Sequence, residues 1–498
     1  MEILYLVSLG LASLISLVIY RLYFHPLSHI PGPTLAKTTH LYEWYYDLYL
    51  GGQFTFQLQD LHKQYGPVIR INPDEVHISD PYFFDQIYNQ TNGRANKPPH
   101  FAGAFGPYPA TIGTAPHELH RLRRSALNPF FSKKSVNDLF PVMWKPVEIL
   151  LQRLKQYSET GEVLNMKYCY AAVTMDIMTG YCFAHEPSNV RQSDFGRKTF
   201  DDVDSFLIFS LLNIHIPWTI RFTYSLPDWV NKILAPAMAS MLDFRLALSE
   251  QVEDIRHDKN VAYKDAGHRT VFHDLLSSKL PPQELERDRL RDEAFSLVTA
   301  GFGTTAYVLR ATAYHIAANQ AIRQKLHEEL VEAIPDIHQP PCLTAIEQLP
   351  CLSAVVLEGL RVSEPVTHRM KRQFPDHSLD YHGISIPKNT VVGTTAMLIH
   401  QNEELFPEPY TFKPERWLGA EGKKLERFLV SFNRGPRACL GINLAKAELF
   451  LILAAVFRQF DFDVSEVKRE RDIDCNRDYI LGAQAVDTPG ILVTVKEC

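Results

Sequence analysis

The chain has 498 residues, of which 46% are apolar and 22% are charged, an ordinary globular balance that supplies a large core. The net charge of -6 argues against a nucleic-acid partner, which would favour a basic surface. The seven cysteines are odd in number and scattered, without a CxxC pair, so the sequence favours free thiols in a reducing compartment over a disulfide framework.

The chain opens with an uncharged run, Ile3–Tyr20, which Arg21 follows directly. As a helix this run spans about 27 Å at ~1.5 Å per residue, close to the ~30 Å of a hydrocarbon core. One alternative is a cleaved signal peptide, but the run ends in bulky residues where cleavage needs small ones. The other is a buried amphipathic helix. We therefore predict a transmembrane signal anchor over residues 1–22.

Prolines mark the segment behind this anchor. Pro26 and Pro31 end the helix and stiffen the chain after it, so residues 23–36 are predicted to form a proline-rich linker. Residues 37–498 show no internal repeat or low-complexity tract. We expect them to form one domain, although the length alone would allow about three, because motifs far apart in the sequence must meet at one site.

The patterns along this domain predict a mainly α chain with a minor β part. Short alternating segments predict strands at Val68–Ile71, Val76–Ile78, Gly383–Pro387, Thr390–Val392 and Gly490–Val495. Helices are predicted at Leu58–Tyr65, through most of residues 119–310, and at Cys351–Val362 and Ile442–Phe457. Breaks are expected near Pro217 and Pro281, and residues 92–118 have the composition of a long loop.

One short stretch near the C-terminal end concentrates the chemistry. Cys439 lies between Gly435 and Gly441, two residues after Arg437 and just before a predicted helix. A thiolate there is stabilised by the positive end of the helix and by unpaired N–H groups, and is a good axial ligand for haem iron. The glycines let the backbone pass close to a flat macrocycle. The Arg437 guanidinium can pair with a haem propionate.

Together with Phe432, these residues form the pattern FxxGxRxCxG, which resembles the haem-ligand signature of the cytochrome P450 monooxygenases at every fixed position. Taken alone, a single cysteine would be read as a buried structural residue after a turn. The resemblance implies the P450 fold in a single large domain. It also implies haem b with Cys439 as axial ligand, and insertion of one atom of dioxygen into an apolar small molecule.

Glu358 and Arg361 lie three residues apart on a predicted helix and so share a face. As an isolated surface pair they would contribute little to stability. Their pattern resembles the ExxR motif of the family, whose third partner comes from a PERW-like motif and here is Arg416. The resemblance implies a buried structural triad that holds the loop carrying Cys439.

The sequence AGFGTT, Ala300 to Thr305, resembles the oxygen-binding segment of the family's longest helix. Thr304 matches the catalytic threonine, whose hydroxyl interrupts the helix and, with ordered water, delivers the protons that oxygen cleavage requires. Gly303 stands where the family usually has Asp or Glu, which leaves the proton route open. The alternative is a flexible glycine-rich helix break without chemistry.

Three further residues match propionate-binding positions of the family. Arg124 matches the arginine of its WxxxR helix, and His120 replaces the tryptophan, which it resembles in donating a ring N–H. A solvated basic helix face is the alternative for both. Arg372 lies where the family has another propionate partner, but Arg369 competes, and the sequence does not decide between them.

The family builds its substrate pocket from segments that are apolar in this chain, which implies an apolar substrate held mainly by shape. Its residues here are Phe101, Phe105, Phe206, Leu207, Phe209, Leu211, Leu212, Phe302 and Val366. The stretches LHKQYGPVIRINPDEVHI and HRLRRSALNPFFS look most like fungal members that decorate terpenoid or polyketide skeletons. We therefore expect a secondary-metabolite intermediate as the substrate.

Electrons are expected from a separate NADPH–cytochrome P450 reductase, because this chain has no flavin or nicotinamide fingerprint. The family's microsomal members suggest a single-pass protein of the endoplasmic reticulum membrane with a cytosolic catalytic domain. Two alternatives stay open. A reductase-independent haem-thiolate isomerase or dehydratase is disfavoured by Thr304 and slightly favoured by Gly303. A non-catalytic haem carrier or sensor would need no apolar pocket beside the iron.

Overall fold

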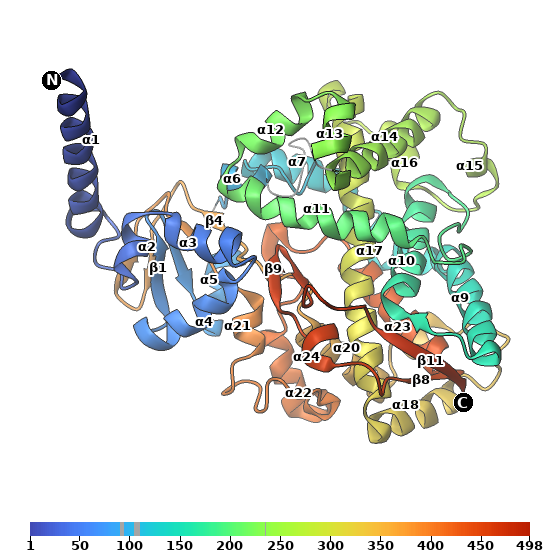
Figure 1. The fold of residues 1–498 in the computed structure, drawn as a ribbon. Coiled ribbons are helices and arrows are strands. Elements are labelled where there is room, and N and C mark those ends of the chain that lie inside the picture. The colour runs from blue at the N-terminus through green and yellow to red at the C-terminus, as the bar shows by residue number, and fades with distance from the viewer. Residues whose placement is uncertain (90–93, 104–109, 235) are drawn as a thin grey trace.

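The computed structural model describes residues 1–89, 94–103, 110–234 and 236–498, and it is a mostly helical domain with small sheets (Figure 1). Helix α1 (Glu2–Ile19) projects from the body, and none of its residues is buried. A π-helical turn, Tyr20–Phe24, extends it. By length and composition this helix could cross a membrane.

The residues predicted to form a linker pack against the body. Leu27 and Ile30 are buried in a cluster beneath the first sheet. The Arg70 N–H donates a 2.7 Å hydrogen bond to the Pro31 carbonyl. Gly32 (φ +152°) lies so close that a Cβ there would be 2.3 Å from the Arg70 carbonyl oxygen. The segment is therefore docked on the sheet rather than extended.

The first sheet lies between α1 and the helical body (Figure 1). This sheet has the order β1-β2-β7-β4, with β2 and β7 parallel and the other pairs antiparallel. Its strands are β1 (Val68–Asn72), β2 (Glu75–Ile78), β7 (Val391–Gly393) and β4 (Arg372–Gln373). Smaller sheets are formed by β5 (Leu379–Tyr381) with β6 (Ile384–Ile386), by β9 (Arg477–Tyr479) with β10 (Leu481–Ala483), and by β3 (Leu164–Asn165), β11 (Leu492–Glu497) and β8 (Phe460–Asp463). Strands β8, β9 and β11 lie beside the helices of the body. All five predicted strands are thus present, with β11 beginning two residues later than predicted.

Helices form the rest of the body. The principal ones are α4 (Phe54–Tyr65), α7 (His117–Leu127), α8 (Lys133–Asp138), α9 (Phe140–Thr160), α10 (Met166–Phe183), α11 (Arg197–His215), α12 (Trp218–Ser225), α13 (Asp228–Leu234), α14 (Pro236–Arg256), α16 (Val271–Leu276), α17 (Arg287–Ala317), α18 (Gln320–Ala333), α20 (Pro350–Ser363), α21 (Ala396–His400), α22 (Gly419–Leu425) and α23 (Ile442–Phe457). The breaks predicted near Pro217 and Pro281 separate α11 from α12 and precede α17, as expected. Helix α4 begins four residues before the predicted start, because Phe54 extends its buried face by one turn.

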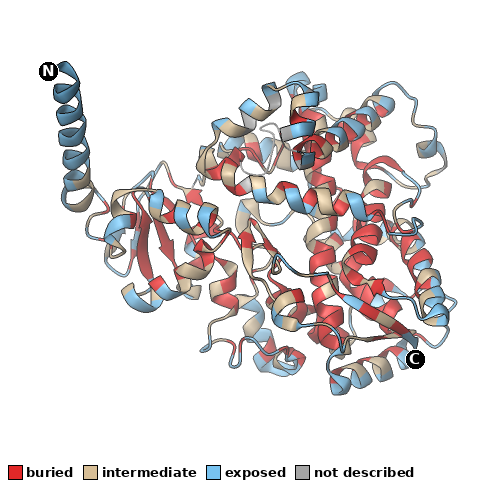
Figure 2. Cartoon of the chain, viewed as in Figure 1, coloured by how far each residue is buried: buried red, intermediate tan, exposed pale blue. Residues whose placement is uncertain are grey.

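Helix α17 runs through the centre of the body, with α10 packed along it and α23 beside it (Figure 1). Figure 2 shows these helices as the most buried part of the molecule. The predicted loop 92–118 contains a short helix, α6 (Pro99–Ala102), and ends where α7 begins. Its residues 104–109, with the pocket candidate Phe105, lie outside the described part of the chain.

Candidate active site

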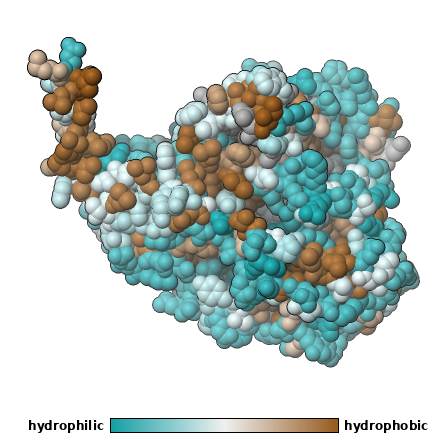
Figure 3. Space-filling model, in the orientation of Figure 1, coloured by the Kyte–Doolittle hydropathy of each residue, from teal (hydrophilic) through white to brown (hydrophobic). Residues whose placement is uncertain are grey.

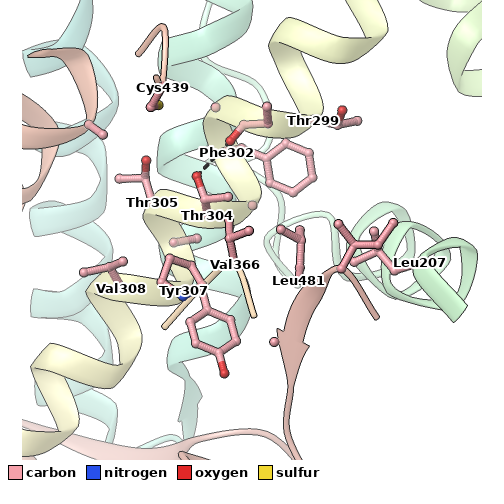
Figure 4. Close-up of a pocket in the computed structure, with 18 of the residues that line it drawn as sticks. Leu207, Thr299, Phe302, Thr304, Thr305, Tyr307, Val308, Val366, Cys439 and Leu481 are labelled. Carbon is pink, nitrogen blue, oxygen red and sulfur yellow. Dashed lines mark hydrogen bonds between the residues drawn. The ribbon is translucent and has the colours of Figure 1, made fainter. Parts of the chain in front are cut away.

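Cys439 lies on the loop between a 3-10 turn, Gly435–Arg437, and the start of α23. Its N–H donates a 2.8 Å hydrogen bond to the Phe432 carbonyl, which fixes the loop as a tight hairpin. Cys439 is exposed to a cavity of about 800 Å³ that α17 crosses (Figure 4). Of the described cysteines, Cys439 alone lines this cavity.

Burial raises the pKa of the Cys439 thiol above its ordinary value. The Gly441 N–H at the start of α23 and the Arg124 guanidinium act in the opposite direction, as expected for a helix end and a cation, but do not overcome burial. Ligation of a metal cation by this sulfur would displace the thiol proton.

The two glycines of the motif have different structural reasons. Gly435 has φ +71°, and a Cβ there would be 1.9 Å from the Tyr88 carbonyl oxygen. Glycine is therefore required at this position because the backbone of Tyr88 packs directly against it. The predicted macrocycle contact of Gly435 stays a prediction. Gly441 lines the cavity, and a Cβ there would meet no atom within 4 Å. It leaves open space in the cavity next to the cysteine loop.

Cationic side chains face the cavity from several segments. Arg372 and Arg437 lie close enough that each lowers the pKa of the buried His120 ring, as do Lys97 and Arg124; burial is the largest cause and the pKa falls to about 2. His120 is therefore a neutral donor. All five side chains line the cavity, and among the described residues no carboxylate forms a salt bridge with Arg124, Arg372 or Arg437.

Arg437 illustrates this environment. Its guanidinium donates 2.8 Å hydrogen bonds to the carbonyls of Thr114 and Ala115, and burial with the nearby Arg372 lowers its pKa to about 9. The same segment, residues 110–116, is held from the other side by Glu293 of α17. That carboxylate accepts hydrogen bonds from the N–H (3.0 Å) and hydroxyl (2.7 Å) of Thr111.

The structure separates the two competing arginines. Arg369 is fully buried away from the cavity and forms ion pairs with Glu43 and Glu75. Arg372 lines the cavity, donates to the Lys371 carbonyl (3.0 Å) and lies over the Tyr88 ring. Only Arg372 is thus placed to meet a ligand in the cavity.

Two further cationic residues of the cavity have contacts that the sequence did not indicate. Arg124 donates to the carbonyls of Ala438 (2.8 Å) and Cys439 (3.3 Å), so its guanidinium braces the cysteine loop. Lys97 was missed because nothing in its sequence surroundings separates it from an exposed loop lysine. It is buried, and its ammonium donates a 2.5 Å hydrogen bond to the Ile112 carbonyl.

Glu358, Arg361 and Arg416 lie together. Arg361 forms two hydrogen bonds with the Glu358 carboxylate, of 2.9 and 2.8 Å, and Arg416 Nε adds a third at 3.0 Å. The carboxylate also accepts the Trp417 indole N–H at 2.8 Å, a partner that the sequence motifs did not indicate. Glu358 and Arg361 are buried, and both guanidinium groups are paired with the one carboxylate.

Two contacts join this triad to the cysteine loop. Arg361 donates a 2.9 Å hydrogen bond to the His400 carbonyl, and the His400 ring accepts the Val430 N–H at 3.0 Å. Ser431 donates to the Leu360 carbonyl at 2.9 Å. The triad thus supports the segment that enters the cysteine loop.

The opposite wall of the cavity is α17, which stays helical through residues 300–305. The predicted interruption is absent there: the Thr304 hydroxyl donates a 2.9 Å hydrogen bond back to the Ala300 carbonyl, drawn dashed in Figure 4. Gly301 is required by α10, because a Cβ there would be 2.4 Å from the Met178 sulfur. A Cβ at Gly303 would meet no atom within 4 Å, so that position borders open cavity.

Four of the predicted pocket residues line the cavity, namely Phe206, Leu207, Phe302 and Val366. Phe101 and Leu211 instead form a separate buried cluster with Ile214 and Ile480. Phe209 packs against the main core, and Leu212 is outside the lining. Phe209, Leu211 and Leu212 follow lining residues closely in the sequence of α11. Because successive residues of a helix point in different directions, their side chains face away from the cavity.

The residues present fit a haem on three counts. A single cysteine among the described residues lines the cavity, and Gly441 leaves open space in the cavity near it in the chain. Arg372 and Arg437 require anionic groups that the described part of the chain does not supply. Two propionates have the matching charge.

Comparison with known proteins identifies the class. Residues 37–487 match the family model of cytochrome P450. Over 463 residues the chain is 40% identical to cytochrome P450 monooxygenase tpcC of Cochliobolus heterostrophus, covering 92% of this chain and 87% of that one. It is 35% identical to tryptophan 6-hydroxylase fscE of Fusarium equiseti (97% and 95% covered) and 34% identical to conidiogenone synthase PchP450 of Penicillium rubens (96% and 96%). The chain belongs to the cytochrome P450 family.

The predicted fold, cofactor and enzyme class are thereby confirmed. The protein is an oxidoreductase, a haem-dependent monooxygenase with haem b and a cysteine axial ligand. Members of the family generally receive electrons from a redox partner and bind small-molecule substrates. The isomerase and carrier alternatives are not favoured.

Proposed function

We propose that Cys439 is the axial ligand of the haem iron and that the cavity above it oxidises an apolar intermediate of fungal secondary metabolism. The observation that carries the proposal is the pairing, within one cavity, of the Cys439 sulfur with two arginines, Arg372 and Arg437, that have no acidic partner among the described residues. Haem bound there supplies the binding and reductive cleavage of dioxygen. The protein residues around it bind the haem, orient the substrate and supply protons.

Each wall has a proposed task. Arg372, Arg437 and the neutral ring of His120 bind the propionates, with Lys97 as an additional donor. Arg124 holds the cysteine loop through the Ala438 carbonyl, and a propionate contact for it stays a proposal from the family motif. The structural triad of Glu358, Arg361 and Arg416 supports the same loop from below.

Thr304 is proposed to move protons at its Oγ1. The hydroxyl already donates to the Ala300 carbonyl, so its lone pairs can accept a hydrogen bond from water in the cavity. Turning the hydroxyl hydrogen away from Ala300 would then pass a proton onward. Because position 303 is glycine, the partner that resupplies this proton must lie elsewhere in the cavity.

The substrate is proposed to be a terpenoid, polyketide or indole-type skeleton. Phe206, Leu207, Phe302 and Val366 give the cavity an apolar distal wall, which favours recognition by shape. Two relatives point the same way by their names, one a conidiogenone synthase and the other a tryptophan 6-hydroxylase.

The electron donor is proposed to be NADPH–cytochrome P450 reductase, and the location the endoplasmic reticulum membrane. Helix α1 is proposed as the anchor of residues 1–22, with the catalytic domain in the cytosol. Figure 3 shows α1 as an apolar column and a second apolar area over α12 and α13, where Trp218, Phe222, Trp229 and Ile233 are exposed. These residues suit contact with a membrane surface.

The test combines ligation and turnover. Cys439→Ala should lose the thiolate band in the carbon monoxide difference spectrum, while Cys475→Ala, a half-buried cysteine outside the cavity, keeps it. Membranes supplied with reductase are then incubated with terpenoid, polyketide and indole substrates, and products are read by mass. A product that forms without NADPH, reductase or dioxygen would favour the isomerase alternative, and a retained thiolate band would refute the ligand assignment.

A further inference from the structure

The part of the cavity remote from Cys439 is polar, and the site described above does not use it. Side chains from the start of α10, the start of α11, α17 and the segment after β10 line it. We call this part the polar arm and define it by Lys167, Asp201, Asp204, Arg310 and Gln484.

The polar arm lies within reach of a ligand held near Cys439. Arg310 follows Thr304 by six residues on α17, which is about 9 Å along the helix axis at ~1.5 Å per residue. Figure 4 shows Cys439 and the Tyr307 ring of the same helix on opposite sides of Thr304. A ligand that extends from Cys439 past Thr304 along α17 therefore meets Arg310.

The two acids of the polar arm are already paired. Lys167 Nζ lies 3.0 Å from an Asp201 oxygen and 2.8 Å from an Asp204 oxygen. Asp201 also accepts a 2.8 Å hydrogen bond from the Tyr168 hydroxyl and lies 3.3 Å from Arg197 Nε. Two carboxylates are thus matched by two cations, Lys167 and Arg197, both of which line the cavity.

Arg310 adds a third cation, and no carboxylate forms a salt bridge with it in the described part of the chain. Its Nη2 donates a 2.8 Å hydrogen bond to Gln484 Oε1, a neutral acceptor, and its guanidinium lies 4.6 Å from the centre of the Tyr307 ring. These contacts fix the plane of the guanidinium and leave other N–H groups available, since arginine has five. The side chain is half-buried and lines the cavity, so a ligand there can contact it.

The other lining arginines have different tasks. Arg477 donates to the carbonyls of Leu50 (3.1 Å) and Gly51 (2.8 Å), so it is bound to the segment before α4. Three more belong to the cofactor end of the cavity, namely Arg124, Arg372 and Arg437. The polar arm therefore carries one positive charge in excess among its described residues, and that charge is on Arg310.

We propose that Arg310 binds a carboxylate of the substrate, at the end of the molecule remote from the carbon that is oxidised. The inference rests on the proposed oxidation of a secondary-metabolite intermediate in this cavity. A planar carboxylate matches the guanidinium fork, and one negative charge matches the one excess positive charge. A diphosphate would bring further negative charge close to Asp201 and Asp204. The substrate is thus an apolar skeleton, packed against Phe302 and Val366, that carries a single carboxylate.

The first test measures binding to the holoprotein and does not depend on the skeleton. Decanoate and methyl decanoate are titrated, and binding is followed by the shift of the haem absorption band. The parent should bind the acid about 10–100-fold more tightly than the ester, the equivalent of one charge-assisted hydrogen bond. Arg310→Met should lose this preference. Gln484→Glu should lose it as well, because it gives Arg310 a carboxylate partner within the protein while the arginine is still present.

Two lining arginines provide matched controls. Arg197→Met removes a cation that Asp201 pairs, and Arg477→Met removes one that backbone carbonyls hold, so both variants should keep the preference for the acid. Turnover gives a second readout. Terpenoid, polyketide and indole substrates are offered to reductase-supplied membranes as free acids and as methyl esters, and Arg310→Met should raise KM for the acids more than it lowers kcat.

The proposal is overturned if the parent binds decanoate no more tightly than its ester, or if Arg310→Met or Gln484→Glu keeps the preference. An equal loss in Arg477→Met would also overturn it, since the overall charge of the cavity would then be the cause. Should Arg310→Met not bind haem, Arg310→Gln replaces it. If none of the offered skeletons is oxidised, the proposed substrate class fails, while the comparison of decanoate with its ester still decides the role of Arg310.

Discussion

Two buried groups of charges lie on either side of the cysteine loop, and they are built on opposite principles. Around Glu358, each cation meets the carboxylate at 2.8–3.0 Å. Around the cavity, Arg372 and Arg437 donate only to backbone carbonyls among the described residues. A group whose cations are paired with a carboxylate inside the protein supports the fold, whereas cations without an acidic partner among the described residues are completed by an anionic ligand.

The largest effect expected from this comparison is at the group around Glu358. Glu358→Gln removes the charge that pairs with Arg361 and Arg416 and should lower the free energy of unfolding by about 3–5 kcal/mol, because it leaves buried cations unpaired. Urea unfolding of the haem-free and haem-bound forms measures it. Glu421→Gln, which breaks an exposed pair with Lys424, should change stability by less than about 1 kcal/mol. Equal effects of the two variants would contradict the structural role.

A change at the cavity arginines should instead affect haem binding more than stability. Arg437→Met should weaken haem binding by about 10–100-fold, the equivalent of one charge-assisted hydrogen bond at about 1.5–3 kcal/mol. The haem-free protein should lose little stability, because the variant loses the hydrogen bonds of Arg437 but is also relieved of a buried cation without an acidic partner among the described residues. Haem titration and unfolding are measured on the same samples. Arg434→Met, whose guanidinium pairs with Asp85 near the surface, is the control and should retain haem.

The glycines of the loop sharpen the comparison without changing charge. Gly435→Ala should destabilise folding by about 1–3 kcal/mol, since φ is +71° and the new Cβ would meet the Tyr88 carbonyl. Gly441→Leu should leave the haem-free protein unchanged and reduce haem binding, because its side chain would fill open cavity. The unfolding curve should therefore change more for Gly435→Ala, and the haem titration should change more for Gly441→Leu.

The smallest effect concerns pH. The pKa of Arg437 is lowered to about 9 in the folded protein, while the unfolded chain keeps its proton to higher pH. Between these values the unfolded state binds more protons, so the stability of the haem-free parent rises with pH relative to Arg437→Met. The difference between the two should be constant below pH 9 and should shift in favour of the parent above it. A difference that does not change up to about pH 10.5 would show that burial does not affect this guanidinium.

Local pattern was sufficient for much of the fold. The strands of the first sheet and the bounds of α23 follow from alternation and from helical spacing that the structure reproduces. What the sequence could not show depends on contacts between distant segments. Thr174 of α10 donates to the Phe302 carbonyl of α17, and His400 links the triad to the loop, but neither residue is distinguished by its neighbours.

The same limit applies to the site. The cysteine motif is contiguous, so its residues could be found by eye, and so could the spaced pair Glu358 and Arg361. The choice between Arg369 and Arg372 required the fold, because it depends on which arginine meets Glu43 and Glu75. Lys97 does not stand out in the sequence and becomes significant only when its burial is known.

The segment 110–116 has a consequence for communication across the site. It is bound at one end by Glu293, on the substrate wall, and at the other by Arg437, beside the cofactor edge. A substrate that displaces Thr111 must therefore also alter the hold on Thr114, and by reciprocity any gain in substrate affinity on loading the cofactor equals the gain in cofactor affinity on loading the substrate. We expect the two ligands to be thermodynamically linked through this short stretch of backbone.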